Sequence, residues 1–250
     1  MKHKTLHGIT WLEFDLLAEH PGVVHGCFLR HGGASQGAFD SLNFGSELGD
    51  SEVSVSHNLM QMQQCLNLPN VASLRQVHGT EVIHISSPSD GLCGDAMVCS
   101  TAEHALMIKH ADCQAAIFYD PKVQVIAAAH SGWRGSVQNI YSNVIANLKH
   151  LGCQPANLLV CIGPSLGPHH AEFVNFRQEL PESFWGYQTK PNLFDFWAIS
   201  KDQLMACGIL SQHIEMAEMC TYENVDDCFS YRRDGLTGRH GTVVMLSKEK

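Results

Sequence analysis

Two apolar runs joined by a short turn constrain the fold of this chain more than any other stretch. Residues 110–135 read HADCQAAIFYDPKVQVIAAAHSGWRG, and the runs flank the tetrapeptide DPKV that begins at Asp120. Asp at the first position of a turn and proline at the second, where it presets φ, favour a tight turn. Residues 112–130 are therefore predicted to form an antiparallel β-hairpin.

The register of this hairpin decides whether Cys113 and His130 are neighbours. If the turn is centred between residues 121 and 122, paired residue numbers sum to 243, and Cys113 lies opposite His130. Opposed residues have Cβ atoms about 4.5 to 5.5 Å apart, so a thiolate and an imidazole can share a metal ion or a hydrogen bond. A register shift of one residue would place the two side chains on opposite faces.

Each of these two residues alone has a simpler explanation. Cysteine is often buried, and a single histidine in an apolar strand is usually a hydrogen-bonded core residue. Their predicted opposition, at the end of a hairpin that runs into Gly132-Trp133-Arg134-Gly135, favours a reactive site instead.

The rest of the chain reads as short strands and helices separated by turns. Strands are predicted at residues 22–30, 81–85, 157–162, 214–219 and 242–246, and helices at 51–66 with a Ser51 N-cap, 136–150, 171–180 and 198–207. Strands outnumber long helices and no linker divides the chain. We therefore expect one α+β (mixed α/β) sandwich domain over residues 1–250, with hairpin-containing mixed sheets flanked by helices.

Composition excludes several classes of protein. A formal charge of −9 with only 16 Lys and Arg argues against a nucleic-acid partner. The chain shows no apolar segment long enough for a signal peptide or a membrane span, so no membrane partner is expected. Ten scattered cysteines without a CxxC pair indicate reduced thiols and a cytoplasmic protein.

A catalytic metal site at Cys113 and His130 requires a third ligand. His78, in the motif RQVHG, precedes a predicted strand, whereas His31, His84, His104 and His110 remain alternatives. One Cys and two His with an open fourth position are typical of catalytic zinc. Copper also binds such a set, but none of the 16 histidines forms the His-x-His pairs expected of a multicopper oxidase.

Arginines beside glycines form a second group of candidates. Of seven arginines, five have this context: Arg30 before Gly32-Gly33, Arg134 within GWRG, and Arg232, Arg233 and Arg239 within YRRDGLTGRHG. Forked guanidinium donors beside flexible backbone can assemble a compact phosphate or carboxylate site, although surface ion pairing is the alternative. Asn43, in SLNFG, is predicted either to bind a ligand or to stabilise a turn.

The motifs together resemble a known family. RHGG with SLNFG, RQVHG, ADC, AAHSGWRG, IGP and SYRRDGLTGR occur in the order of the laccase-domain family, from about residue 24 to 246. That family is described as multicopper polyphenol oxidase and as multifunctional purine nucleoside phosphorylase, and members are linked to peptidoglycan editing. The resemblance implies one domain, similar in fold to the catalytic domain of deamidating toxins, with zinc bound by His78, Cys113 and His130.

The same resemblance implies an activity and its partners. It implies phosphorolysis of inosine, adenosine and methylthioadenosine to base and sugar 1-phosphate, with adenosine deamination as a side activity, by a monomer or homodimer. The expected catalytic residues are Cys113, His130 and Arg134, and the expected substrate-binding residues are Arg30, Asn43, Gln76 and Arg233.

The sequence departs from the family pattern at three places near these motifs. His110 stands where members carry Thr, Ser165 where they carry Cys, and Ala171-Glu172 where they often carry Tyr-Glu. None of these positions is an implied zinc ligand. The departures concern the substrate pocket.

Three other functions remain open from the residues alone. Cys113 could be a nucleophile with His130 as its base, in a Cys-His hydrolase, deamidase or amidase acting on a cell-wall precursor. The chain could be a laccase-like copper polyphenol oxidase. It could also be an interaction module without catalysis, in which the glycine-flanked arginines bind a partner.

Overall fold

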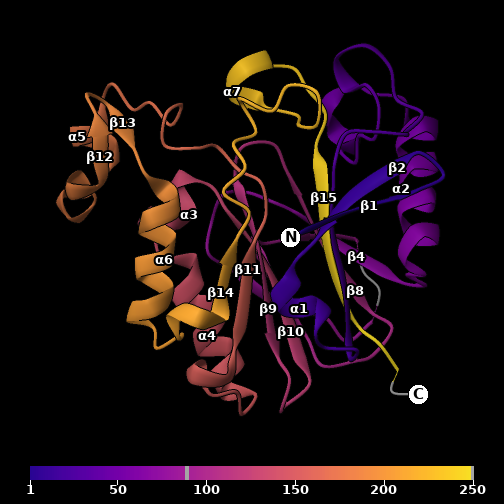
Figure 1. Ribbon diagram of the computed structural model, residues 1–250, viewed down its shortest axis with the longest axis horizontal. Helices are drawn as coiled ribbons and strands as arrows, with labels where there is room; N and C mark the ends of the chain where they lie inside the picture. The colour runs from indigo at the N-terminus through magenta and orange to yellow at the C-terminus, as the bar shows by residue number, and fades with distance from the viewer. Residues whose placement is uncertain (88–89, 249–250) are drawn as a thin grey trace.

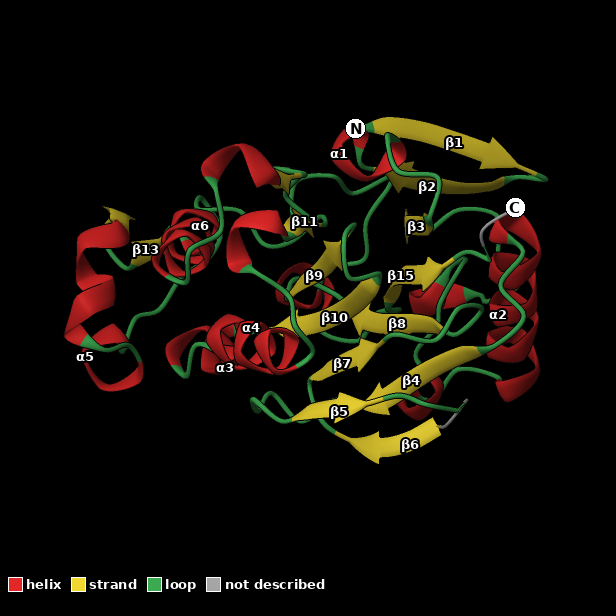
Figure 2. Ribbon diagram, turned by 90° about the horizontal axis from the view of Figure 1, so that it is seen from below, coloured by secondary structure: helices red, strands yellow, loops and turns green. Residues whose placement is uncertain are grey.

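Two β-sheets packed face to face form the centre of the protein. The computed structural model describes residues 1–87 and 90–248, and the ribbon shows helices outside the stacked sheets (Figures 1 and 2). In spatial order the larger sheet contains β1 (Lys2–Leu6), β2 (Ile9–Glu13), β3 (Val23–Phe28), β15 (His240–Leu246), β8 (Ala105–His110), β4 (Val71–Arg75) and β6 (Asp90–Cys93).

The smaller sheet contains the predicted hairpin. Its order is β14 (Ile214–Met216), β11 (Leu159–Ile162), β9 (Gln114–Asp120), β10 (Val125–Ser131), β7 (Ala96–Cys99) and β5 (Val82–His84). A separate pair joins β12 (Gln188–Lys190) to β13 (Leu193–Phe194). Parallel and antiparallel pairs occur in both large sheets, which confirms the predicted mixed α+β architecture.

The apolar runs of the hairpin are continuous because both faces of the smaller sheet are buried. Ile117 and Tyr119 of β9 point into the core between the two sheets, whereas Ala116 and Phe118 pack beneath the outer helix α4 (Ile140–His150). Helix α2 (Glu52–Leu66) covers the outer face of the larger sheet. Figure 2 shows α4 and α2 on opposite sides of the strands.

The remaining helices are short or lie near one end of the sheets. They are α1 (Asp15–Ala18), α3 (Trp133–Val137), α5 (Phe176–Glu179), α6 (Phe196–Ala206) and α7 (Tyr231–Asp234). Within the described residues, no helix has the length and apolarity to cross a membrane.

The hairpin register differs from the predicted one by two residues. Val125 pairs with Asp120 and His130 pairs with Ala115, so the predicted opposition of Cys113 and His130 is wrong. The cause is a four-residue loop: Asp120 Oδ1 accepts hydrogen bonds from the backbone N–H groups of Lys122 (2.9 Å) and Val123 (3.0 Å). Because side chains alternate along a strand, a shift of two residues keeps Cys113 and His130 on one face.

Several other predicted elements are confirmed, and others are not. The Ser51-capped helix, the strands near residues 23–28 and 159–162, and the helix at 196–206 are present. The helix predicted at 136–150 is split where Asn139, with φ of 54°, caps α4. Strands β1, β2, β4, β6, β7, β8, β12 and β13 were not predicted.

The helix predicted at 171–180 is wrong over most of its length. Only Phe176–Glu179 is helical. The Arg232 guanidinium accounts for part of the difference, because it donates to the carbonyls of His170 (3.0 Å) and Glu172 (3.1 Å), which a helix would use in its own hydrogen bonds.

Replacing Asp120 with alanine tests how the hairpin loop is closed. Asp120 is fully buried, and the substitution removes the acceptor of two backbone N–H groups. We expect Asp120→Ala to lower the free energy of unfolding by about 1 to 3 kcal/mol, measured by chemical denaturation. Asp120→Asn, which keeps an Oδ1 acceptor, is the matched control, and equal losses in both variants would contradict this account.

Candidate metal centre

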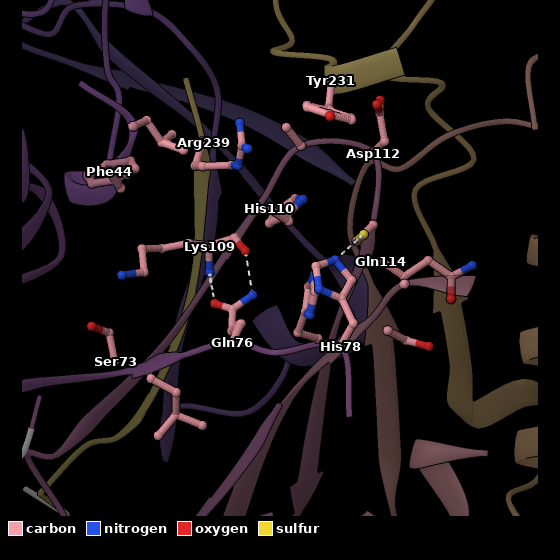
Figure 3. A pocket seen from close by; sticks show the side chains of 18 of the residues that line it. Phe44, Ser73, Gln76, His78, Lys109, His110, Asp112, Gln114, Tyr231 and Arg239 are labelled. Carbon is pink, nitrogen blue, oxygen red and sulfur yellow. Dashed lines mark hydrogen bonds between the residues drawn. The ribbon is translucent and has the colours of Figure 1, made fainter. Parts of the chain in front are cut away.

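His78, Cys113 and His130 meet at the open end of the hairpin. His78 follows β4, Cys113 immediately precedes β9, and His130 lies in β10. Cys113 Sγ is 3.9 Å from His78 Nε2, and the ligand atoms of all three residues lie within 4.8 Å of one another (Figure 3). The two imidazole rings are 4.9 Å apart and nearly perpendicular, at 76°. Three segments that are distant in sequence thus present one sulfur and two nitrogen atoms to one point.

The backbone is specialised at two of these positions. His78 has a φ of 61°, and Asp112, next to Cys113, has a φ of 83°, in the left-handed region that such residues seldom adopt. Asp112 is held there by the Thr221 hydroxyl at 2.6 Å and by the backbone N–H of Arg232 at 2.5 Å. Hydrogen bonds therefore fix the conformation that presents Cys113.

Asp95, at the start of β7, orients the two histidines. It is fully buried, and its Oδ1 accepts from His130 Nδ1 (2.9 Å) and from the backbone N–H of His78 (2.9 Å). Its Oδ2 accepts from the backbone N–H groups of Gly79 (2.7 Å) and Val77 (3.2 Å). A carboxylate only accepts, so Nδ1 of His130 carries a proton and Nε2 is the nitrogen available to a metal.

The charges within the cluster are coupled. Burial alone would raise the pKa of the Cys113 thiol, but His130 and His78 outweigh it and lower that pKa to about 6. Burial alone would lower the pKa of His130, but Cys113 and Asp95 raise it to about 9. The metal-free pair is therefore a thiolate and an imidazolium near neutral pH, and a metal ion would replace the imidazolium proton.

The donor set and the space around it suit zinc. One thiolate and two imidazoles are ligands that zinc prefers, and three protein ligands leave a fourth position open. Gly132 leaves room for the His78 and Cys113 side chains, because a Cβ atom at this position would lie only 2.9 Å from His78 Cδ2 and 3.0 Å from Cys113 Sγ.

The cluster forms part of the wall of a cavity of about 890 Å³. Among the described residues, five of the chain's 16 Lys and Arg residues line this cavity, and two acidic residues do. The basic residues are Arg75, Lys109, Arg134, Arg232 and Arg239, and the acidic residues are Glu47 and Asp112. Aromatic rings are supplied by Phe44, Trp133, Phe173, Phe196 and Tyr231. In a chain of net charge −9, this cavity suits an anion together with a flat, apolar group.

Arg134, which was predicted to be catalytic, and Gln76, which was predicted to bind substrate, both line the cavity. The Arg134 guanidinium stacks on the Trp133 ring, 4.5 Å from its centroid, and among the described residues it has no acidic partner. Gln76 also lines the cavity, but its side-chain amide is paired with the backbone of Lys109 at 2.7 and 2.9 Å (Figure 3).

The other three predicted substrate-binding residues are not among the described residues that line the cavity. Arg30 donates to the carbonyls of Asp40 and Val225. The Arg233 guanidinium donates to backbone carbonyls of residues 221, 222 and 228. Asn43 is fully buried, and its Oδ1 accepts the backbone N–H of Arg239 at 2.8 Å. These contacts give the three side chains a role in holding loops.

Two of the three departures from the family pattern concern the cavity directly. His110 and Ala171 line it, whereas Ser165 lies outside the lining and its hydroxyl accepts from Trp197 Nε1 at 2.7 Å. His110 is buried, with Nε2 2.8 Å from the Thr242 hydroxyl and no described partner for Nδ1.

Reasoning from sequence missed Asp95 and the aromatic lining. The one available signal for Asp95 was its position directly before the apolar run of β7, which suggests that its side chain is buried. A buried carboxylate needs hydrogen-bond partners, so such a residue is a candidate for holding other side chains in place. Arg232 and Arg239 belonged to the predicted arginine group, but only Arg233 of that motif was assigned to substrate.

The fold and this cluster define an α/β protein with a candidate His-Cys-His metal centre in a cationic cavity. A family model described as multi-copper polyphenol oxidoreductase laccase matches residues 24–247. The chain therefore belongs to the laccase-domain family, as its motifs indicated.

Two named relatives and a solved structure agree with this assignment. The chain is 33% identical over 247 residues to a protein of Pseudomonas aeruginosa named purine nucleoside phosphorylase, covering 94% of this chain and 98% of the relative. It is 30% identical over 237 residues to purine nucleoside phosphorylase YfiH of Escherichia coli, covering 90% and 94%. The crystal structure of YlmD from Geobacillus stearothermophilus superposes with a TM-score of 0.87 at 27% identity, covering 98% of each chain.

A methyl group at Gly132 tests the space beside the ligands. We expect Gly132→Ala to weaken zinc binding at least about tenfold, because the new Cβ displaces His78 and Cys113. Gly135→Ala is the control, since its Cβ would meet its nearest neighbour at 3.6 Å, an ordinary contact. Competition with a chromophoric chelator measures both affinities, and equal affinities would count against the site.

The pH dependence of zinc binding tests the coupled charges. Zinc must displace the His130 proton, whose pKa is about 9, so the apparent affinity should rise about tenfold per pH unit from about 6 and level off above about 9. Below about pH 6 the slope should steepen, because Cys113 then takes up a proton as well. Asp95→Asn removes a group that raises the His130 pKa, so the plateau should begin at lower pH. An affinity that is flat between about pH 6.5 and 8.5 in the wild type would contradict this assignment.

Proposed function

We propose that this chain is a zinc-dependent purine nucleoside phosphorylase. It converts inosine, adenosine and methylthioadenosine with phosphate to the base and sugar 1-phosphate, and deaminates adenosine as a side activity. The supporting observation is that the candidate metal centre, the basic residues and the aromatic rings share one cavity. The relatives named purine nucleoside phosphorylase, at 30% and 33% identity over most of this chain, support the same activity.

In this proposal the basic residues of the cavity bind the phosphate. Arg134 is the first candidate because it is exposed, lines the same cavity as the candidate metal centre and lies four residues after His130 in the sequence. Arg232 and Arg239 add positive charge, while their donors to backbone carbonyls hold them in place. Forked donors fixed before phosphate arrives reduce the entropy cost of orienting it for attack.

The aromatic residues of the cavity bind the nucleoside in this proposal. Trp133, Phe173 and Tyr231 offer apolar faces on which a purine can stack, and they limit water near the sugar. Excluding water matters because water competes with phosphate for the anomeric carbon as the bond to the base breaks.

His78, Cys113 and His130 would hold the zinc ion. When bound, zinc supplies Lewis-acid polarisation of a substrate oxygen. Asp95 contributes by keeping the His130 proton on Nδ1, which leaves Nε2 for the metal. All ten cysteines are free, in agreement with the cytoplasmic location that we propose.

A second candidate function has a specific observation in its favour. Cys113, His130 and Asp95 form the series of thiolate, imidazole and orienting carboxylate that cysteine hydrolases use. A Cys113-dependent hydrolase or deamidase acting on a cell-wall precursor would use the same cavity without a metal.

The phosphate dependence of base release tests the first proposal. With inosine as substrate, we expect release to require phosphate, and Arg134→Ala to raise the KM for phosphate at least about tenfold with a smaller change for inosine. Arg177→Ala is the matched control, since Arg177 stacks on Phe176 and Trp185 and is absent from the described lining. Base release that is independent of phosphate would refute the proposal.

Metal removal separates the two candidate functions. A phosphorylase that depends on zinc should lose activity on chelation and regain it with added zinc. A Cys-His hydrolase should resist the chelator and be inactivated by iodoacetamide in the metal-free form, where Cys113 is a thiolate.

A further inference from the structure

Three side chains outside the cavity form a second cluster of metal-ligand type. His170 Nε2 is 3.0 Å from Glu223 Oε1, and the ligand atoms of His170, Cys220 and Glu223 all lie within 4.8 Å of one another. His170 belongs to the loop before α5, and the other two belong to the loop before α7. One sulfur, one nitrogen and one carboxylate oxygen are a ligand set suited to zinc.

The sulfur atom is held by its surroundings. Cys220 is buried, and its Sγ accepts a hydrogen bond from the backbone N–H of Gly167 at 3.2 Å. Gly167 allows this approach, because a Cβ there would lie 3.0 Å from Cys220 Cβ and 3.1 Å from Sγ. An isolated parallel β-bridge between Ser165 and Cys220 holds the two backbone segments together. The Gly167 N–H therefore fixes the position of the sulfur atom that would bind the ion.

The histidine is held as well. Its ring stacks on Tyr222, with centroids 4.1 Å apart and an angle of 15°, which leaves the ring edge free to face Glu223. Arg232 donates to the carbonyls of His170 and Glu172 and so holds the loop that carries the ring. Two of the three ligands are thus oriented by contacts that do not involve the cluster itself.

A surface ion pair alone does not account for this arrangement. An exposed pair of His170 with Glu223 would contribute little to stability and would not need a buried thiol beside it. The side chains of His170 and Glu223 are 28% and 51% exposed, so solvent reaches the cluster from one side while Cys220 closes the other. An ion can therefore enter and keep a water ligand.

We propose that His170, Cys220 and Glu223 bind one zinc ion, or another borderline divalent cation, as a second metal site of this protein. The ion would tie the loop that carries Leu166 and Ala171, both of which line the cavity, to the loop before α7. Thr221, next to Cys220, donates to Asp112, which precedes Cys113, so the second site adjoins the support of the first. The proposal does not rest on the phosphorylase activity.

Counting bound ions tests this site. The full-length chain, stripped of metal and titrated with Co²⁺ and then Zn²⁺, should bind two ions per chain. Cys113→Ala should still bind one ion and show cobalt–thiolate absorption from Cys220. His170→Ala should bind one ion fewer than the wild type, or bind the second at least about 100-fold more weakly, because it loses one of three ligands.

Matched substitutions control for non-specific binding and for folding. His169→Ala removes the exposed neighbouring histidine, and Cys207→Ala removes a half-buried thiol outside the cluster. Both should bind two ions. Glu223→Gln keeps the size of an exposed side chain, so it should not disturb folding, and it should weaken only the second site.

The opposing results are equally definite. One ion per chain in the wild type that is lost in Cys113→Ala, two ions of unchanged affinity in His170→Ala, or no cobalt–thiolate absorption in Cys113→Ala would each overturn the second site. None of these results would alter the phosphate dependence of base release, so the two proposals fail separately.

Discussion

Four hydrogen bonds to the buried Asp95 carboxylate hold the site together. The donors are the backbone N–H groups of Val77, His78 and Gly79, and the His130 imidazole. This carboxylate thus joins the segment after β4 to the end of β10, across the two sheets. Without it, His78 would lose the anchor of its left-handed backbone and His130 the partner that selects its nitrogen. Because the charge is fully buried, every one of these donors is needed to offset its desolvation.

The cavity concentrates a net positive charge in a chain whose overall charge is negative. Basic residues outnumber acidic ones in its wall, although the whole chain carries a charge of −9. An anionic substrate would therefore be drawn to this cavity rather than to the surface at large. Arg134 combines two properties that suit phosphate recognition, since its guanidinium stacks on Trp133 and the residue lines the same cavity as the candidate metal centre.

Local patterns in the sequence predicted part of this structure. The Ser51 cap and the β9–β10 hairpin could be read because their signals lie within a few residues. The hairpin register could not, since the Asp120 side chain closes a longer loop than the backbone turn alone suggests. The 171–180 segment was misread in part because the distant Arg232 takes the carbonyl groups of His170 and Glu172.

In the candidate site, too, the sequence predicted some residues and missed or misassigned those whose role depends on distant contacts. His78 was one of five possible third ligands until the family resemblance selected it, and the structure brings it to Cys113. Asp95 had no motif, because its role depends on partners 16 to 18 residues before it and 35 after it. Arg30 and Arg233 matched the arginine pattern as well as Arg134 did, and only the fold shows which guanidinium reaches the cavity.

An anomalous difference map at the zinc absorption edge, from crystals grown with zinc and phosphate, tests the central claim most directly. We expect a peak bonded to His78 Nε2, Cys113 Sγ and His130 Nε2, at about 2.0 to 2.3 Å, with phosphate in the same cavity against Arg134. A cavity with no peak at these three atoms, in crystals where phosphate is bound, would contradict the account.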